Sequence, residues 1–126
     1  MSEAGSARKT NRPIERYGDF WPYYLQEHAA PGTRAIHYFG TLLSTSLVAI
    51  AILTRNGWFA LAALAGGYGP AWIGHFFIER NRPATFRYPL WSLMSDYRMT
   101  WRWMSGKLGR DLVRAGVETG RASTLR

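Results

Sequence analysis

Three histidines are the strongest candidates for chemistry in this sequence: His28, His37 and His75. His37 stands at the start of an apolar segment that runs from about residue 36 to 54, and His75 stands near the end of a second, from about 58 to 78. Both lie nearly the same number of residues from the turn between Arg55 and Asn56. If the two segments are helices folded back on each other, the depths of the two histidines differ by only ~1.5 Å at ~1.5 Å rise per residue.

Other residues can join this pair. His28 precedes His37 across the Pro31-Gly32 break, which can fold it back over the same place. Glu79 follows His75 by about one helical turn, so both lie on one helix face. Imidazole with carboxylate suits iron, zinc, manganese or copper, and two histidines with one carboxylate leave positions open on iron(II) for oxygen and substrate. Spacing alone leaves two interpretations open: a metal site, or histidines that merely lie near a membrane interface.

The elements that would position these residues are two membrane-spanning helices. Between Tyr38 and Ile78 the only formally charged residue is Arg55, and the first segment is close to the minimum length for a ~30 Å hydrocarbon core. Each segment carries small or polar residues at helical spacing, a pattern that favours helix contact in lipid. These stripes are His37, Gly40, Thr41, Ser44, Thr45 and Val48, and then Ala60, Ala63, Gly67, Ala71 and Gly74. A short Asn-Gly turn makes the helices antiparallel neighbours, and glycines with a proline at 66–70 predict a kink.

Two further helices are expected beside the hairpin. A short aromatic helix, capped by Asp19 and ending near His28, is typical of a membrane-edge belt, or it packs on the rest of the domain. An amphipathic helix at about 90–107 lies in the membrane surface or packs over the hairpin. The predicted fold is therefore all-α: an antiparallel transmembrane hairpin with a short N-terminal interfacial helix and a C-terminal amphipathic helix. We expect a disordered segment at 1–16, a single membrane-embedded domain at 17–108 and a basic flexible tail at 109–126.

Charge and composition narrow the function. The net charge is +8, and basic residues gather at both ends of the hairpin. The positive-inside rule therefore predicts an integral membrane protein with two spans, with both termini and the histidines on the cytoplasmic side. The chain has no cysteine, which excludes thiolate metal sites and cysteine nucleophiles. Its aromatic residues lie in apolar runs and are not interleaved with basic ones, so nucleic-acid binding is not expected.

Three blocks of residues resemble a known family. The blocks are YYLQEH at 23–28 with RAIHYFGT at 34–41, AWIGHFFIERNRPA at 71–84, and PLWSLMSDYRM at 89–99. Over roughly residues 17–105 the chain resembles the 2-hydroxy fatty acid (2-hydroxypalmitate) dioxygenase-like membrane proteins, formerly a domain of unknown function. The G-H-x-x-x-E-x-x-x-P-A pattern is the specific part. Many relatives have Asn shortly before the second histidine, where this chain has Thr33.

The resemblance implies an iron(II)-dependent enzyme of fatty acid α-oxidation, which consumes O2, releases CO2 and shortens a 2-hydroxy fatty acid by one carbon. The family's essential histidines fall on His28, His37 and His75. We therefore predict these three as catalytic metal ligands for Fe(II). Glu79 is predicted either as a fourth ligand or as a partner that fixes the tautomer of an imidazole.

Substrate contacts are predicted beyond the second segment. Arg80, Arg82 and Arg87 could hold the substrate carboxylate through two-pronged hydrogen bonds, or they meet lipid phosphates instead. Asp96 either orients a ligand histidine or is a solvated polar residue. The expected partners are a 2-hydroxy fatty acid, O2 and the lipid bilayer.

Two other functions fit the same residues. In a haem protein, His37 and His75 would be axial ligands across the hairpin. In a non-catalytic membrane scaffold, the small residues would drive formation of a homo-oligomer and no metal would be bound.

Overall fold

The computed structural model describes residues 12–117 of the 126-residue chain. The described residues form helices and connecting loops, with no strand among them, so the predicted all-α class is confirmed for them. The elements are α1 (Tyr17–Gln26), α2 (Pro31–Thr54), α3 (Trp58–Ile73), the π-helix η1 (Gly74–Glu79), the 3-10 helix η2 (Ala84–Phe86), α4 (Pro89–Met104) and α5 (Leu108–Arg114).

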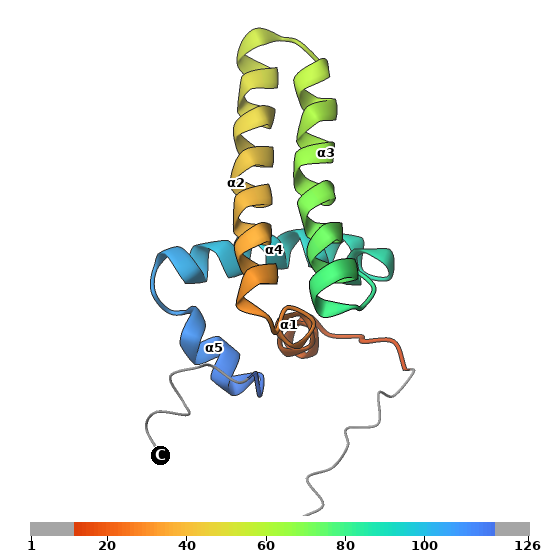
Figure 1. The fold of residues 1–126 in the computed structure, drawn as a ribbon, viewed down its shortest axis with the longest axis vertical. Helices are drawn as coiled ribbons and strands as arrows, with labels where there is room; N and C mark the ends of the chain where they lie inside the picture. Colours follow the sequence, from red (N-terminus) through yellow and green to blue (C-terminus); the bar gives the residue numbers. More distant parts are fainter. Residues whose placement is uncertain (1–11, 118–126) are drawn as a thin grey trace, which may run out of the picture.

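Helices α2 and α3 lie side by side as the two arms of a hairpin (Figure 1). Arg55 turns the chain in a left-handed conformation, with φ 54°. Small residues make the contact between the arms: a Cβ on Gly40 would lie 3.2 Å from the carbonyl oxygen of Gly66, and the Ser44 hydroxyl donates to the carbonyl oxygen of Ala63 at 2.9 Å. This close approach keeps the two helix backbones near each other at the level just above the histidines.

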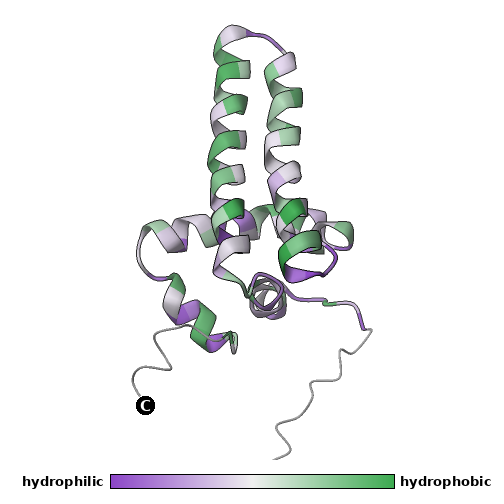
Figure 2. Ribbon diagram, in the orientation of Figure 1, coloured by the Kyte–Doolittle hydropathy of each residue, from purple (hydrophilic) through white to green (hydrophobic). Residues whose placement is uncertain are grey.

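One helix among the described residues, α2, is long and apolar enough to cross a membrane. Helix α3 ends at Ile73, where the backbone widens into η1, and falls short of that length as a regular helix. Figure 2 shows the apolar character of both arms, with hydrophilic segments at the turn and at the base of the hairpin. The structure supports one candidate span, and the second span predicted from the sequence is not shown by it.

The helix is not broken at 66–70, where glycines and a proline predicted a kink or a locally broken turn. Helix α3 continues through Pro70 to Ile73, and the irregular backbone lies later, in η1, which ends where Arg80 adopts φ 55°. Gly66 and Gly67 stay helical because they pack against Gly40 of α2, and tertiary contact overrides weak helix propensity. Single π-turns inside helices are frequent at functional sites.

The hydrophobic core lies at the base of the hairpin, around α1. Its members include Phe20, Trp21, Tyr24, Leu25, Tyr38, Met99, Leu108 and Leu112. The interfacial belt predicted for the N-terminal helix is therefore wrong for its main aromatic residues, which are buried. The predicted cap is also wrong: α1 begins at Tyr17 after Arg16, and Asp19 lies in the first turn, where its charge favours the helix N-terminus.

Helix α4 crosses the base of the hairpin (Figure 1) with an inverted pattern of burial. Its apolar stripe is exposed, and its buried residues are Ser92, Ser95, Met99 and Thr100. Leu90, for example, is 74% exposed. A helix on a water-soluble domain buries its apolar stripe instead. The outward stripe is what a helix lying against lipid would present.

The first part of the basic flexible tail predicted at 109–126 is an ordered helix. Leu108–Arg114 form α5, with Leu112 buried against the core near α1. Asp111 is buried too and accepts two hydrogen bonds from the Arg102 guanidinium, at 2.7 and 2.9 Å. This paired contact fixes α5 on α4 and shows why a charged sequence can still be ordered. Residues 118–126, and residues 1–11 of the predicted N-terminal segment, lie outside the described residues.

Candidate metal centre

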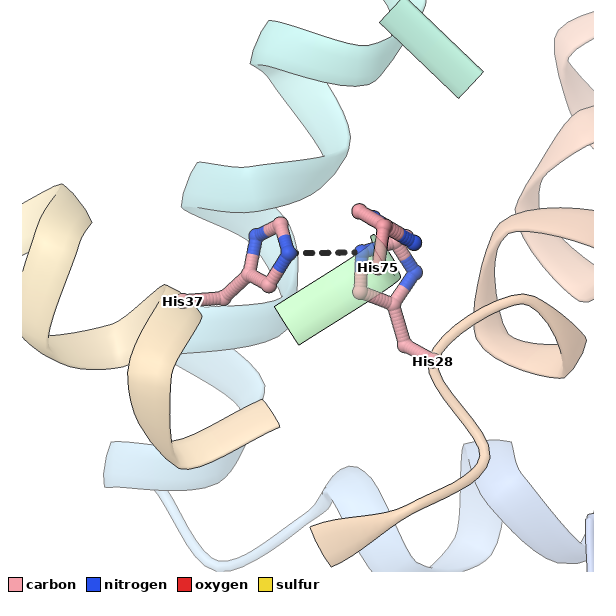
Figure 3. Close-up of side chains that lie close together, drawn as sticks. All are labelled: His28, His37 and His75. Carbon is pink, nitrogen blue, oxygen red and sulfur yellow. Dashed lines mark hydrogen bonds between the residues drawn. The ribbon is translucent and has the colours of Figure 1, made fainter. Parts of the chain in front are cut away.

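The three histidines meet at the base of the hairpin (Figure 3). His28 comes from the α1–α2 loop, His37 from the second turn of α2, and His75 from η1. The Nε2 atoms of His28 and His37 are 3.1 Å apart, and one nitrogen from each of the three rings lies within 4.8 Å of the others. All three side chains are buried, with at most 5% of their surface exposed. The convergence expected from the spacing is therefore present in the fold.

Arg34 holds the loop that carries His28. Its guanidinium Nη1 donates to the carbonyl oxygens of His28, at 2.9 Å, and Ala29, at 2.7 Å. Arg34 is itself buried, in the first turns of α2. Pro31 begins that helix, a position where its missing N–H costs nothing. A buried cation bonded to backbone carbonyls ties the loop to the helix, and so fixes His28 relative to His37.

Two acceptors fix the outer nitrogens of His28 and His37. His28 Nδ1 donates to the carbonyl oxygen of Tyr24 at 2.6 Å, and His37 Nδ1 lies 3.3 Å from Asp96 Oδ1. The Tyr24 hydroxyl donates to the same carboxylate oxygen. Burial, followed by the charge of Asp96, raises the pKa of Tyr24 well above its ordinary value, so this hydroxyl keeps its proton. Asp96 therefore lies where it orients a histidine, as one of its two predicted roles requires.

Asn81 performs the same task for His75. Its Oδ1 accepts from His75 Nδ1 at 2.7 Å, and its Nδ2 donates to the Glu27 carbonyl oxygen at 3.1 Å and to the Glu27 carboxylate. The two Glu27 acceptors settle which end of the Asn81 amide is oxygen. The sequence analysis missed this residue. The signal that could have found it is its place in the second family motif, just after the helix.

These contacts restrict the protonation states of the site. A carbonyl or amide oxygen can only accept, so Nδ1 of His28 and of His75 carries a proton, and each of these rings, when neutral, keeps an unprotonated Nε2. The pKa of His28 is held well below its ordinary value by burial and by the two neighbouring histidines, which keeps that ring neutral. The short Nε2–Nε2 approach of His28 and His37 is a hydrogen bond if the His37 ring carries two protons, and it brings two lone pairs together if that ring is neutral with its proton on Nδ1.

Between neutral rings, a cation relieves the repulsion of the two lone pairs. Metal–nitrogen bonds of ~2.0–2.1 Å place two nitrogen ligands roughly 2.9–3.4 Å apart, depending on the angle between them. The observed 3.1 Å between the Nε2 atoms of His28 and His37 falls in this interval. Histidine ligands of metals commonly donate their other N–H to a carboxylate or backbone carbonyl, which is the arrangement found here. The residues present therefore fit a metal held by His28, His37 and His75.

The other predicted site residues lie around this group. The Glu79 carboxylate accepts from the backbone N–H of Ala30, at 2.5 Å, at the start of α2, and is not one of the three converging groups. Arg80, Arg82 and Arg87 are exposed. The Arg87 guanidinium lies over the ring of Tyr88, 5.6 Å from its centre. The structure thus brings the histidines and Asp96 together and leaves the three arginines at the surface.

A cavity of about 170 Å³ extends from the histidines between α2, α3 and α4. His28, His37, His75 and Asp96 line its inner end. The rest is lined by α2, α3, the η2 segment and α4, with apolar residues such as Leu64, Trp72 and Leu93 and with a few hydroxyl groups. The three histidines therefore open into the same cavity as these apolar side chains. This arrangement suits a ligand with a polar end and an apolar body.

By fold and site, this is a small all-helical protein with a buried three-histidine group that can bind a metal. Residues 14–108 match the family model described as Mpo1-like, 2-hydroxy-palmitic acid dioxygenase Mpo1-like, and the chain belongs to that family. The match confirms the resemblance carried by the three sequence blocks. No curated protein and no solved structure matches the chain.

Proposed function

We propose that this protein is a membrane-bound, non-haem iron(II) dioxygenase that shortens 2-hydroxy fatty acids by one carbon. The reaction takes up O2 and gives the shorter acid, CO2 and water. One observation carries the proposal: three buried histidines each place a ring nitrogen within 4.8 Å of the others. Nδ1 of His28 and of His75 donates to a protein oxygen, and Nδ1 of His37 lies 3.3 Å from the Asp96 carboxylate, which leaves the Nε2 atoms to bind a metal. Membership of the Mpo1-like family supports the choice of substrate and reaction.

Iron(II) bound there would supply the centre at which O2 and the hydroxy acid react. The protein's own residues prepare this centre. The Asp96 carboxylate lies 3.3 Å from His37 Nδ1, and its negative charge makes the opposite nitrogen of that ring a better electron donor. The Tyr24 hydroxyl donates to the same carboxylate and keeps it facing His37. Burial of the three rings excludes water from the inner end of the cavity.

We also propose that the α2–α3 hairpin crosses the membrane twice, with both termini and the histidines on the cytoplasmic side. The arms expose large apolar residues, among them Ile52, Leu53 and Trp58 near the turn, each more than 70% exposed. Apolar surface of this extent marks contact with lipid or another protein. Helix α3 and η1 together span about 33 Å at ~1.5 Å per residue, enough for a ~30 Å core. The histidines then lie at one boundary, where the carboxylate of a fatty acid lies.

The direct test is to load the purified protein with iron(II), add 2-hydroxypalmitate and O2, and look for the acid one carbon shorter. In parallel, iron per chain is measured for alanine variants at His28, His37 and His75. We expect each variant to lose iron and activity, because a missing imidazole removes one ligand. Ser46→Ala, at an exposed position on α2, is the matched control. Unchanged iron content in all three histidine variants would overturn the metal site.

The haem alternative is disfavoured by the geometry. The three ring centres form a triangle: the centre of the His28 ring lies 4.3 Å from that of His37 and 4.4 Å from that of His75, and the other two are 5.1 Å apart, so His28 fills the space beside them. A porphyrin between His37 and His75 would need that space. A Soret band in the purified protein would restore this alternative. A protein without iron and without O2 uptake would favour the membrane scaffold.

A further inference from the structure

The mouth of the cavity lies between α3 and α4. The lining residues that are also exposed are Leu64, Tyr68 and Trp72 of α3 and Leu93 and Tyr97 of α4. On the other side α4 contacts α2, where the hydroxyls of Thr45 and Tyr97 are 2.6 Å apart. Any ligand that reaches the histidines from the apolar side therefore passes the α3–α4 mouth, which faces the same surroundings as the exposed arms of the hairpin.

The cavity has no cation of its own. None of its lining residues is lysine or arginine, so the protein supplies no positive side chain to a ligand within it. An anionic head group must then lie at the metal end, and the aromatic and leucine side chains of the mouth suit an alkyl chain. A ligand with an anionic head and an apolar tail can therefore lie in the cavity in one direction only, with its tail at the mouth.

Ser92 offers an unused hydrogen bond inside the cavity. It lines the cavity from α4, is 2% exposed, and its hydroxyl has no hydrogen-bond partner among the described residues. Buried polar atoms are nearly always paired, and an orphan in a native protein needs an explanation. An oxygen of a bound ligand would be the missing partner, since the hydroxyl can donate to a carboxylate or to an alcohol.

We propose that a single unbranched acyl chain enters sideways between α3 and α4, with its polar head at the histidines and Ser92 and its tail in the mouth. The identification of the head as a 2-hydroxy acid rests on the proposed function. The cavity of about 170 Å³ encloses the head and the first part of the tail, and it opens at the mouth. The remainder of a long chain extends into lipid. The site therefore selects the head group and tolerates many chain lengths.

The mouth is tested with Leu93→Trp and two substrates, 2-hydroxypalmitate and 2-hydroxyhexanoate. The added ring narrows the mouth and displaces the tail of the long acid, so kcat/KM for 2-hydroxypalmitate should fall by roughly tenfold or more, the effect of losing good apolar contact. For 2-hydroxyhexanoate, kcat/KM should change by less than about twofold. Leu90→Trp is the matched control, because Leu90 is exposed on the same helix and does not line the cavity. Equal losses for both acids, or none for either, would overturn the lateral entrance.

A second readout does not need turnover. A 2-hydroxypalmitate analogue with a diazirine in mid-chain is irradiated with the iron-loaded protein, and the adduct is located by mass spectrometry. Adducts on α3 or α4 at the mouth support the entrance, and adducts on the outer face of α2, near Phe39 and Leu42, contradict it. Adducts at the mouth without any shortened acid would remove the proposed reaction and keep the entrance. Formation of the shortened acid together with adducts elsewhere would keep the proposed reaction and remove the entrance.

Ser92→Ala tests the head-group contact. We expect KM for 2-hydroxypalmitate to rise roughly tenfold, with kcat within about twofold and a lower yield of the photo-adduct, because a hydrogen bond to a charged group is lost. The melting temperature should not fall, since the hydroxyl has no partner in the free protein. Ser95→Ala, the control, removes the 3.0 Å hydrogen bond between the Ser95 and Tyr17 hydroxyls and should lower the melting temperature with KM unchanged. An unchanged KM and adduct yield for Ser92→Ala would exclude this role.

Discussion

At the scale of single residues, the site depends on acceptors more than on the histidines themselves. Nδ1 of each imidazole faces an oxygen of different origin: a backbone carbonyl from α1 for His28, a carboxylate from α4 for His37 and an amide from the loop after η1 for His75. These oxygens turn the opposite nitrogens of the rings toward one another, where they can act together as electron-pair donors to a metal. The chemistry of the site is set by groups that no histidine spacing can reveal.

Asn81 is the most sensitive of these acceptors. Asn81→Ala would free the His75 ring to rotate and would leave the Glu27 carboxylate without its partner. We expect the affinity for iron(II) to fall roughly 10–100-fold, as for other partners of metal-bound histidines. Competition with a chelator of known affinity measures the change. Asn56→Ala, at the exposed turn of the hairpin, should leave the affinity unchanged. An equal affinity in the two variants would mean that Asn81 does not orient His75.

Glu79 can be assigned by one conservative change. Glu79→Gln keeps an oxygen that can accept from the Ala30 N–H but removes the negative charge beside the start of α2. From its place outside the three-histidine group we expect iron affinity to remain nearly constant. The free energy of unfolding should fall by about 0.3–1 kcal/mol, the usual value of an acidic group at a helix N-terminus. A large loss of iron affinity would instead identify Glu79 as a fourth ligand.

At the scale of elements, the register of α2 against α3 brings two histidines to one level. Thr33 contributes as well: a Cβ on Gly74 would lie 3.1 Å from its methyl carbon, so α2 and η1 touch beside the site. The equal distances of His37 and His75 from the turn predicted this level from the sequence. The π-turn that carries His75 could not be predicted, because glycine and proline at 66–70 gave a stronger local signal at the wrong place.

The glycines of the hairpin allow a paired test of this contact. A Cβ at Gly40 meets the backbone oxygens of Gly66 and Gly67 at 3.2 and 3.3 Å, whereas one at Gly69 meets nothing within 4 Å. Overpacking costs typically 1–3 kcal/mol and replacing a helical glycine gains up to ~1 kcal/mol. We therefore expect Gly40→Ala to lower the free energy of unfolding by up to about 2 kcal/mol, and Gly69→Ala to raise it by up to ~1 kcal/mol.

Denaturant titration in detergent micelles measures both variants on the same scale. Iron affinity should follow the same order, because Gly40 lies one turn after His37 and a displaced α2 would move that ring. The same sign of change for both variants would show that the two helices are not held by this contact.

At the scale of the whole molecule, apolar residues are divided between two environments. The aromatic core at the base, around Phe20 and Tyr24, is buried, while the arms of the hairpin and one stripe of α4 expose their apolar side chains. The sequence predicted the apolar arms, since they lack charge, but it left two places open for the aromatic helix, a membrane edge or the packed domain. Aromatic clusters look alike in a core and at a membrane edge, and only the packing of α4 and α5 on α1 decides between them.

The two-span arrangement has a direct test because the chain contains no cysteine. Single cysteines are placed at Asn56, in the turn, and at Gly109, in α5, where a Cβ meets nothing within 4 Å. Two spans with cytoplasmic termini require that a membrane-impermeant maleimide, added outside intact cells, labels Asn56→Cys at once and Gly109→Cys only after permeabilisation. The apolar arms favour this result, since α2 extends for about 36 Å at ~1.5 Å per residue and covers a ~30 Å hydrocarbon core. If α2 alone crossed, both positions would lie on the same side and would be labelled together.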